Sequence, residues 1–284
     1  MPARTVRDTI GASSGHRVLD VVKAPRLPSA QAVPPELAQP SAPALSVVIP
    51  AYREARCLAR SLAEVREFLD GSGRLDTTEI VLVTADAPDE TVAIARREIG
   101  RFPLRRHLEP GIKVGKGRDV RCGMTAATGT FVVFMDADLA TPLHHLPTMI
   151  DMLERGCDVV IGVRDLTRIH RDWARKLSSQ LANQLVQWLL LPAVRDTQCG
   201  FKGFRREVIG ALFGPMTALR WGFDFEILAR AHRLGMSIEE LPVDDWRDPK
   251  GDDGLVGEPP WQARASALGE LMSVWARSKL DRHA

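Results

Sequence analysis

The chain has 284 residues, 45% of them hydrophobic and 26% charged, so it can build the core of one large domain or two small ones. Its 38 basic and 36 acidic residues give a formal net charge of +2, which argues against a general nucleic-acid binder because that class needs a marked basic excess. Local basic clusters that hold phosphate groups are compatible with this balance.

The cysteines favour a reduced compartment. Cys57, Cys122, Cys157 and Cys199 form no C-x-x-C pair, so we expect small core or near-site residues. No run approaches the roughly 18 apolar residues of a membrane span, and no apolar segment follows the early arginines as in a signal peptide. We therefore expect a cytoplasmic protein, with any membrane contact peripheral and at the inner face of the membrane.

Residues 1–44 are predicted to be a disordered tail. The proline-rich run 32–43 shows little apolar periodicity and cannot bury enough surface to offset the entropy of ordering. The remainder, 45–284, is expected to be the folded domain. It divides into a nucleotide-binding part at about 45–140 and an acceptor part at about 141–284. The sequence leaves the oligomeric state open.

The first half of this domain alternates strands and helices. The run 45–50 is short, apolar and β-branched, which is typical of a buried strand. The next segment carries Leu58, Leu62, Val65 and Leu69 on one helical face. Further strands are predicted over 79–83, 130–135 and 157–162, and further helices over about 89–99 and 117–127. This alternation predicts an α/β fold with a mostly parallel sheet covered by helices.

The second half is predicted to be more helical. We expect helices over about 171–191, 223–234 and 261–280, a strand over 237–243, and a Gly-, Asp- and Pro-rich loop over 250–260. The first of these helices carries tryptophans and basic residues, so it fits either a membrane interface or a core or dimer contact. His144 and His145 are adjacent, and we interpret them as loop or helix-start residues rather than metal ligands.

An acidic pair follows the strand predicted over 130–135. Ligands of an α/β sheet bind beyond the carboxyl ends of its strands, and Asp136-Ala137-Asp138 stands at such an end. Two carboxylates that flank one small residue can hold Mg²⁺ or Mn²⁺, with substrate phosphates as further ligands. A metal there would neutralise a diphosphate leaving group. The alternative, that Asp136 and Asp138 only cap the next turn, is disfavoured by the strand ahead of them.

Five segments, in order along the chain, resemble the family 2 inverting glycosyltransferases of the GT-A fold. They are residues 47–54, 115–124, 134–138, 196–202 and 221–228. Their order and spacing look most like the polyprenyl-phosphate sugar transferases, and among these the dolichyl-phosphate β-glucosyltransferase branch. The resemblance spans about residues 45–250 and implies a GT-A fold and a nucleotide-sugar donor, with UDP-glucose favoured.

The resemblance also implies residue roles. Pro50, Tyr52 and Glu54 would hold the nucleotide base and ribose, while Lys116 and Arg121 would lie near the diphosphate. Because glycines flank Lys116, both its ammonium and nearby backbone N–H groups can approach phosphate oxygens. A solvated turn lysine is the alternative for Lys116.

Three further positions bear on the substrates. Lys202 is a candidate ligand of the diphosphate or of an acceptor phosphate, with an exposed lysine as the alternative. The family usually ends its second strand with two aspartates, whereas residues 84–86 here are Thr-Ala-Asp. Either Asp86 takes the place of these aspartates from a shifted position, or the base is recognised differently. The identity of the nucleotide is therefore left open. Leu139 cannot bind a metal, so phosphates and waters would complete the coordination.

The acceptor decides which catalytic groups are needed. A phosphate acceptor carries about −1.5 to −2 charge and needs no strong base. Arg164, which follows a predicted strand, and Arg175 are candidates to grip it, with surface ion pairs as the alternative. A hydroxyl acceptor needs a base, for which Asp224 and Glu226 are candidates. Either carboxylate could instead stabilise the start of a helix.

The predicted function is metal-dependent, inverting transfer of a hexose, with glucose favoured, from a nucleotide-sugar to a polyprenyl phosphate. Asp138, Asp224, Arg164 and Lys202 are the candidate catalytic residues. One alternative is transfer to a soluble hydroxyl or amino acceptor, and another is a non-catalytic nucleotide-sugar-binding protein. A nucleotidyltransferase is disfavoured, because residues 52–54 do not supply the glycine-rich phosphate loop that it would need.

Overall fold

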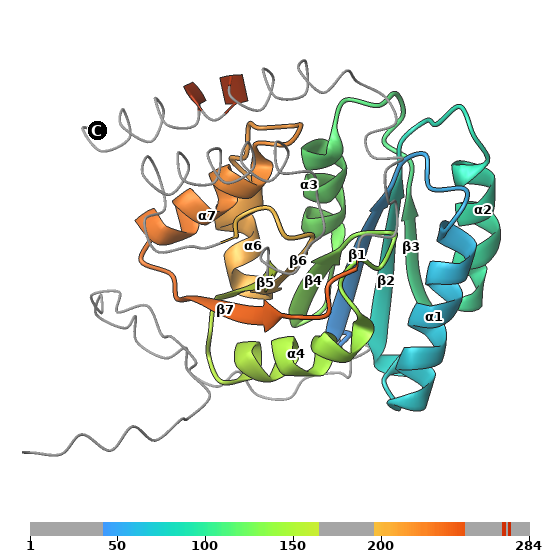
Figure 1. Ribbon diagram of the computed structural model, residues 1–284, viewed down its shortest axis with the longest axis horizontal. Helices are drawn as coiled ribbons and strands as arrows, with labels where there is room; N and C mark the ends of the chain where they lie inside the picture. Colours follow the sequence, from blue (N-terminus) through green and yellow to red (C-terminus); the bar gives the residue numbers. More distant parts are fainter. Residues whose placement is uncertain (1–41, 165–195, 248–268, 271, 274–284) are drawn as a thin grey trace, which may run out of the picture.

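The structure is a computed structural model that describes residues 42–164, 196–247, 269–270 and 272–273 (Figure 1). Several sequence expectations lie outside these residues: most of the tail, the helix over 171–191, Arg175, the loop over 250–260 and most of the helix over 261–280. None of the described helices is long and apolar enough to cross a bilayer.

One sheet forms the centre of the described part of the chain. Its strands are β1 (Leu45–Ala51), β2 (Thr78–Thr84), β3 (Leu104–Leu108), β4 (Phe131–Met135), β5 (Val159–Arg164), β6 (Phe201–Arg205) and β7 (Ile238–Val243). They lie in the order β3-β2-β1-β4-β6-β5-β7. Only β6 runs antiparallel to its neighbours, β4 and β5. The carboxyl ends of the other strands and the start of β6 therefore share one edge of the sheet.

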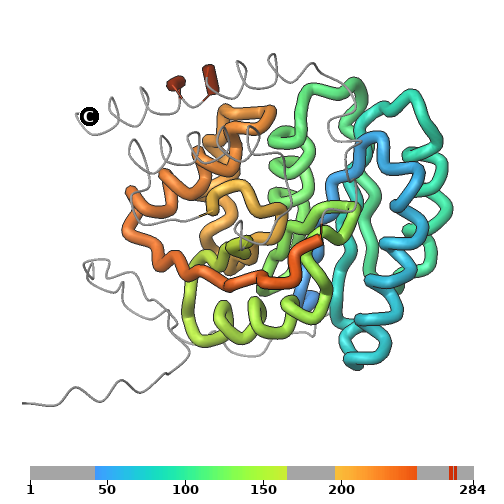
Figure 2. Tube along the Cα trace, viewed as in Figure 1, coloured from blue at the N-terminus to red at the C-terminus, as the bar shows by residue number. Residues whose placement is uncertain are grey.

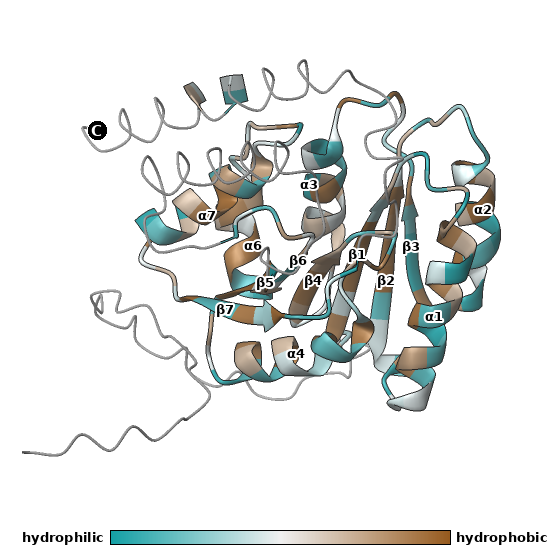
Figure 3. Ribbon diagram, in the orientation of Figure 1, coloured by the Kyte–Doolittle hydropathy of each residue, from teal (hydrophilic) through white to brown (hydrophobic). Residues whose placement is uncertain are grey.

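Helices cover both faces of this sheet (Figure 1). On one face lie α1 (Leu58–Gly71), α2 (Thr91–Glu98) and α4 (Leu146–Glu154); on the other lie α3 (Lys116–Ala126), α6 (Arg206–Phe213) and α7 (Phe223–Arg233). Short 3-10 turns occupy Leu75–Thr77, Ile99–Arg101 and Leu143–His145. Figure 3 shows the consequence: β1 and β4 are largely brown and apolar, while the helices turn teal, polar surfaces outward.

The α/β fold with a mostly parallel sheet, predicted from the sequence, is confirmed. The predicted strands and helices of the described region lie within a few residues of the observed ones. Strands β3 and β6 and helices α4 and α6 were not predicted. Strand β3 is a charged edge strand, with Arg105 and Arg106 exposed, and β6 carries the buried Lys202 as its second residue. Neither strand shows the apolar run that marks a buried strand.

The chain returns to the acidic end of β4 after its last described strand. The N–H of Arg247 donates to the carbonyl oxygen of Ala140 at 2.8 Å. Figure 2 shows this approach, where the orange segment beyond β7 reaches the green segment that follows β4. Residues far apart in sequence are thereby brought to one edge of the sheet.

Candidate active site

The predicted acidic pair lies where the sheet exposes its strand ends. Asp136 and Asp138 directly follow β4, and Lys116 is the first residue of α3. The Lys116 Nζ lies 2.5 Å from Asp136 Oδ1. Asp138 Oδ1 accepts the N–H of Ala140 at 3.2 Å, within a tight turn in which Leu139 has φ 53°. Lys116, Asp136 and Asp138 therefore form one cluster, which we call the acidic cluster.

The charges of the acidic cluster are coupled. Burial by itself lowers the pKa of the Lys116 ammonium, but the carboxylates of Asp136, Asp224 and Asp138 outweigh it and the pKa is raised. Lys116 therefore stays charged and acts as the local counter-ion. Carboxylate oxygens are the donors that Mg²⁺ and Mn²⁺ prefer, and they already gather around a cation here. The residues present fit a divalent metal.

Gly200 supports the carboxylate of Asp136. The carbonyl oxygen of Gly200 accepts the N–H of Asp136 at 3.0 Å. A Cβ added at Gly200 would overlap the Asp136 carboxylate itself. Glycine at position 200 is therefore a steric requirement of the acidic cluster, independent of backbone flexibility.

Gly200→Ala is expected to displace Asp136 and lower catalytic activity by roughly 100-fold, because about 1 Å of misplacement at a reacting site can cost that much. Gly210→Ala on α6 is the matched control, since a Cβ there meets nothing within 4 Å. Steady-state turnover and thermal melts of both variants provide the measurement. If Gly200→Ala has normal turnover, Gly200 does not position Asp136 for function.

Lys202 and Asp224 form a buried pair behind the acidic cluster. Lys202 is 0% exposed, and its Nζ lies 2.6 Å from Asp224 Oδ1 and 2.6 Å from the carbonyl oxygen of Cys199. Burial raises the pKa of the Asp224 carboxyl more than Lys202 and Lys116 lower it. The exposed-lysine alternative for Lys202 is wrong. Because its ammonium is covered and paired with Asp224, a direct phosphate contact by Lys202 stays a prediction.

Arg164 is paired as well. At the end of β5, its Nε and Nη2 donate to the two oxygens of Asp196 at 2.6 and 3.0 Å. Burial by itself lowers the pKa of Arg164 and raises that of Asp196, because it disfavours charged side chains. The pairing outweighs burial, so the pKa of Arg164 is raised and that of Asp196 is lowered. The guanidinium also lies 5.4 Å from the ring centroid of Trp246. Arg164 thus ties β5 to the segment that leads into β6, and any phosphate contact would use its remaining N–H groups.

The backbone at the start of α3 is already engaged. The N–H groups of Gly117 and Arg118 donate to the carbonyl oxygens of Arg220 and Leu219, each at 2.9 Å. A Cβ at Gly115 or Gly117 would collide with this same loop. These glycines therefore permit close packing of the loop. The N–H groups of Gly117 and Arg118 are therefore already paired and not open to a phosphate, and phosphate contact by the side chain of Lys116 stays a prediction.

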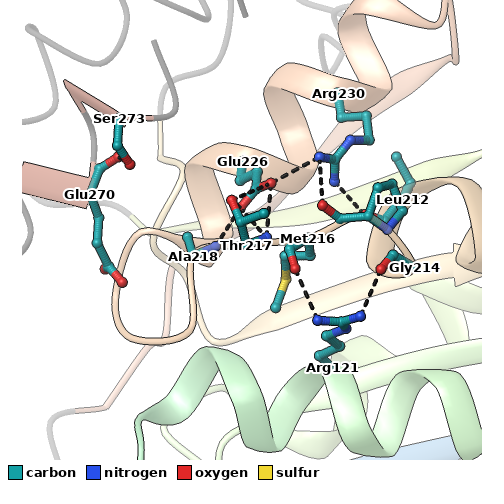
Figure 4. A network of polar contacts seen from close by, with 11 residues as sticks. Arg121, Leu212, Gly214, Met216, Thr217, Ala218, Glu226, Arg230, Glu270 and Ser273 are labelled. Carbon is teal, nitrogen blue, oxygen red and sulfur yellow. Dashed lines mark hydrogen bonds and ion pairs between the residues drawn. The ribbon is translucent and has the colours of Figure 1, made fainter. Parts of the chain in front are cut away.

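Arg121 does not join the acidic cluster. Its guanidinium donates to the carbonyl oxygens of Met216 and Gly214, at 3.0 and 2.7 Å, in the loop between α6 and α7 (Figure 4). Its expected place near the diphosphate is thus not observed. Because Arg121 lies more than one turn beyond Lys116 on α3, its side chain extends toward that loop instead.

Glu226 holds the same loop from the other side (Figure 4). Its carboxylate accepts the N–H groups of Thr217 and Ala218, the latter at 2.6 Å, and pairs with Arg230 at 2.8 Å. Every one of these contacts is structural, so Glu226 is an anchor of the loop that covers the start of α3. Its role as a candidate base is not supported by this placement.

Glu226→Gln is expected to lower the free energy of unfolding by about 2 kcal/mol, because the amide NH₂ group would face buried backbone donors and the Arg230 pair would be lost. Glu207→Gln is the control: Glu207 pairs with Arg205 but is 64% exposed, so a change near zero is expected. Urea unfolding of both variants gives the comparison. Equal effects would show that the loop does not depend on Glu226.

The residues expected to bind the nucleotide lie along the same edge. Pro50 and Tyr52 stand at the end of β1, with Lys113 Nζ 3.7 Å from the centroid of the Tyr52 ring. The N–H of Glu54 donates to Thr91 at 2.9 Å. Asp86 is exposed just beyond β2. The fold thus brings this set beside the acidic cluster, because β1 lies between β2 and β4.

His144 and His145 lie at the start of a helix, as expected, in the turn directly before α4, and both contact Asp245. His145 Nε2 lies 2.6 Å from Asp245 Oδ1, and His144 Nε2 lies 3.3 Å from Asp245 Oδ2. Their ring centroids are 4.3 Å apart. The contact with Asp245 could not be predicted from the sequence, because Asp245 lies in the segment after β7, 100 residues from His145. The three groups could hold a metal ion, but their contacts are explained equally well by attachment of that segment.

Comparison with known families agrees with this fold. The family model described as "Glycosyl transferase family 2" matches residues 46–213. The matched span contains β1 through α6 and therefore the acidic cluster.

Named relatives include glycosyltransferase AglD of Haloferax volcanii, 36% identical over 73% of this chain, although the match spans only 34% of AglD. Dolichyl-phosphate beta-glucosyltransferase ALG5A of Trichomonas vaginalis is 33% identical, with 76% of this chain and 70% of that protein covered. The human dolichyl-phosphate beta-glucosyltransferase is 28% identical, with 73% and 68% covered.

Among solved structures, glucosyl-3-phosphoglycerate synthase of Mycobacterium tuberculosis superposes with a TM-score of 0.60 at 19% identity. The superposition covers 82% of this chain and 79% of the synthase, which in that structure is in complex with Mn²⁺, UDP-glucose and phosphoglyceric acid. At this identity the likeness shows the fold alone, and it confirms the expected GT-A fold.

Proposed function

The chain belongs to glycosyl transferase family 2 and is a glycosyltransferase, and on that premise we propose that it transfers glucose from UDP-glucose to a polyprenyl phosphate. The transfer inverts the anomeric carbon and uses Mg²⁺ or Mn²⁺. The observation that carries the proposal is the acidic cluster at the carboxyl end of β4, where the Lys116 Nζ lies 2.5 Å from Asp136 Oδ1 and where ligands of such sheets bind. The names of several relatives support the donor sugar and the acceptor.

The donor side of the reaction needs positive charge near the leaving diphosphate. A metal held by Asp136 and Asp138 would supply part of that charge when bound. The ammonium of Lys116, whose Nζ lies 2.5 Å from Asp136 Oδ1, would add positive charge beside it. Gly200 and Lys202 contribute indirectly, by fixing the positions of Asp136 and Asp224.

The described residues favour a phosphate acceptor over a hydroxyl. Both carboxylates that the sequence offered as bases are occupied: Asp224 is 6% exposed and paired with Lys202, and Glu226 anchors a loop. A phosphate is already ionised, so it can attack the anomeric carbon without a base. The N–H groups that Asp196 leaves unused on Arg164 are proposed to orient that phosphate.

The test is turnover of the purified full chain with a panel of nucleotide-sugars. Each donor is supplied with Mn²⁺ or with a chelator, and with polyprenyl phosphate, a soluble phosphorylated acceptor or no acceptor. Release of UDP from UDP-glucose should require both the metal and polyprenyl phosphate. Release that depends on the soluble acceptor alone would overturn the assignment of the acceptor.

Asp86 is proposed to contribute to base recognition from the end of β2. The motive is its position at the nucleotide side of the sheet, where the family usually has two aspartates. Asp86→Ala should weaken discrimination between uridine and guanosine donors roughly ten-fold, the cost of about one hydrogen bond to a charged group. Asp76→Ala, an exposed aspartate at the opposite edge, is the control. Unchanged discrimination in Asp86→Ala would leave base recognition to other residues.

A further inference from the structure

Exposed apolar side chains gather beside the site. Five large apolar side chains are exposed in the described part of the chain, and three of them are Ile112 at 80%, Val114 at 41% and Trp221 at 38%. The exposed basic residues Lys113 and Arg220 lie directly next to them in sequence. We call the set of Ile112, Lys113, Val114, Arg220 and Trp221 the rim patch.

The rim patch is one surface although it comes from two loops. Ile112, Lys113 and Val114 precede α3, while Arg220 and Trp221 precede α7. The two loops touch, since the N–H of Gly117 donates to Arg220 and a Cβ at Gly115 would collide with the backbone of Arg220. The loop with Arg220 is in turn fixed by the network of Figure 4.

The rim patch borders the acidic cluster. Val114 is two residues ahead of Lys116, and the Lys116 Nζ lies 5.7 Å from the centroid of the Trp221 ring. A β-bridge joins Ile112 to Asp86, so the patch also reaches the nucleotide side of the site. A surface that covers the rim patch would therefore lie beside the acidic cluster.

The apolar and basic side chains of the rim patch indicate which kind of surface it can bind. Apolar side chains flanked by basic ones suit the headgroup region of a bilayer that contains anionic lipid. The carboxylates of Asp86 and Glu270 are nearby opposing charges, and that of Glu270 accepts the N–H groups of Arg220 and Gly222 at 3.0 and 2.7 Å. A symmetric contact between two copies of the chain is disfavoured, because it would bring Lys113 and Arg220 of one copy toward the same residues of the other.

We propose that the rim patch docks the protein on an anionic bilayer surface. Ile112, Val114 and Trp221 enter the headgroup layer, and Lys113 and Arg220 contact anionic headgroups. The acidic cluster then lies next to the layer in which the phosphate of a polyprenyl acceptor resides. Delivery of the acceptor phosphate to the site rests on the proposed function, whereas binding of the rim patch to the bilayer does not.

The experiment is flotation of the full chain with vesicles, in the absence of donor and acceptor. The vesicles are made of phosphatidylcholine alone or with phosphatidylglycerol as the minor component. The wild-type protein should float with the anionic vesicles, and the double variant Ile112→Ser/Val114→Ser should bind roughly ten-fold less. Leu234→Ser is the matched control, because Leu234 is 51% exposed at the far end of α7 from Trp221.

A second pair of variants tests the charges. Lys113→Gln/Arg220→Gln should weaken binding to anionic vesicles about 25-fold, from about 1 kcal/mol for each charge near the surface. Arg60→Gln on α1, where the side chain of Arg60 is 71% exposed, should bind as the wild type does. Equal binding by the wild type and Ile112→Ser/Val114→Ser would overturn the proposal. So would sedimentation of the wild type as a dimer that this double variant abolishes.

Turnover separates this proposal from the proposed function. The Ile112→Ser/Val114→Ser variant should keep its turnover with a short, water-soluble prenyl phosphate and lose it with long-chain polyprenyl phosphate in vesicles. Patch-dependent flotation without transfer to either acceptor would support docking and overturn the proposed function. Equal transfer in vesicles by the wild type and this variant would overturn docking and leave the proposed function standing.

Discussion

Asp138→Ala is expected to remove the metal dependence of donor binding and to weaken UDP-glucose binding in Mn²⁺ by at least about 100-fold. The reason is that the acidic cluster offers two carboxylates at the end of β4, and loss of one leaves Asp136 alone, already paired with Lys116. In a chelator, the wild type and the variant should bind the donor equally weakly. Titration calorimetry with and without Mn²⁺ measures both quantities.

One further variant separates the effect of the Asp138 charge from that of its turn contact, and a second variant serves as a control. Asp138→Asn keeps an oxygen that can accept the N–H of Ala140, so it should fold normally and still lose metal-dependent binding. Asp151→Asn, an exposed change on α4, should bind donor and metal as the wild type does. Retention of metal-dependent binding in both Asp138 variants would show that the metal is held elsewhere.

Lys202→Met is expected to lower the free energy of unfolding by about 3–5 kcal/mol. The substitution leaves Asp224 buried without its partner, and removing one member of a buried pair costs that much in other proteins. Replacing both residues, as Lys202→Met/Asp224→Leu, should recover most of the loss, because no buried charge is left unpaired. Urea unfolding of the single and double variants gives the coupling energy.

The outcome also decides the role of this pair. A loss below about 1 kcal/mol in Lys202→Met would mean that the ammonium is solvated in solution and therefore able to contact a phosphate. Arg60→Met, at an exposed ion pair on α1, calibrates the effect of removing a charge without burial. Arg164 is paired with Asp196 in the same way, so Arg164→Ala can also destabilise the fold. Its effect on acceptor binding can therefore be read only if the stability of the variant is measured as well.

The strands that carry the site could be predicted from the sequence. Strands β1, β2 and β4 each contain a short apolar, β-branched run, which is typical of strands buried on both faces. The position of Asp136 and Asp138 follows from the end of β4, since the strand fixes where its next residues emerge. Tyr52 and Asp86 follow from β1 and β2 by the same argument.

The partners of the charged side chains could not be predicted. Lys202 meets Asp224 because β6 inserts antiparallel between β4 and β5, and the short sequence of β6, with lysine, glycine and arginine, gives no apolar signal. Arg121 and Glu226 bind a loop whose path depends on packing between α3, α6 and α7. Such contacts are set by tertiary structure, and residue spacing along the chain does not encode them.

The central claim is that the chain forms a β-linked glucosyl phosphate on a polyprenyl lipid. The most direct measurement is nuclear magnetic resonance of the lipid product isolated after incubation with UDP-glucose, Mn²⁺ and polyprenyl phosphate in vesicles. The account predicts one new sugar whose anomeric carbon is bonded to the lipid phosphate in the β configuration, and no product with Asp138→Ala. An α-linked product, glucose attached to a hydroxyl, or the same product formed in a chelator would contradict it.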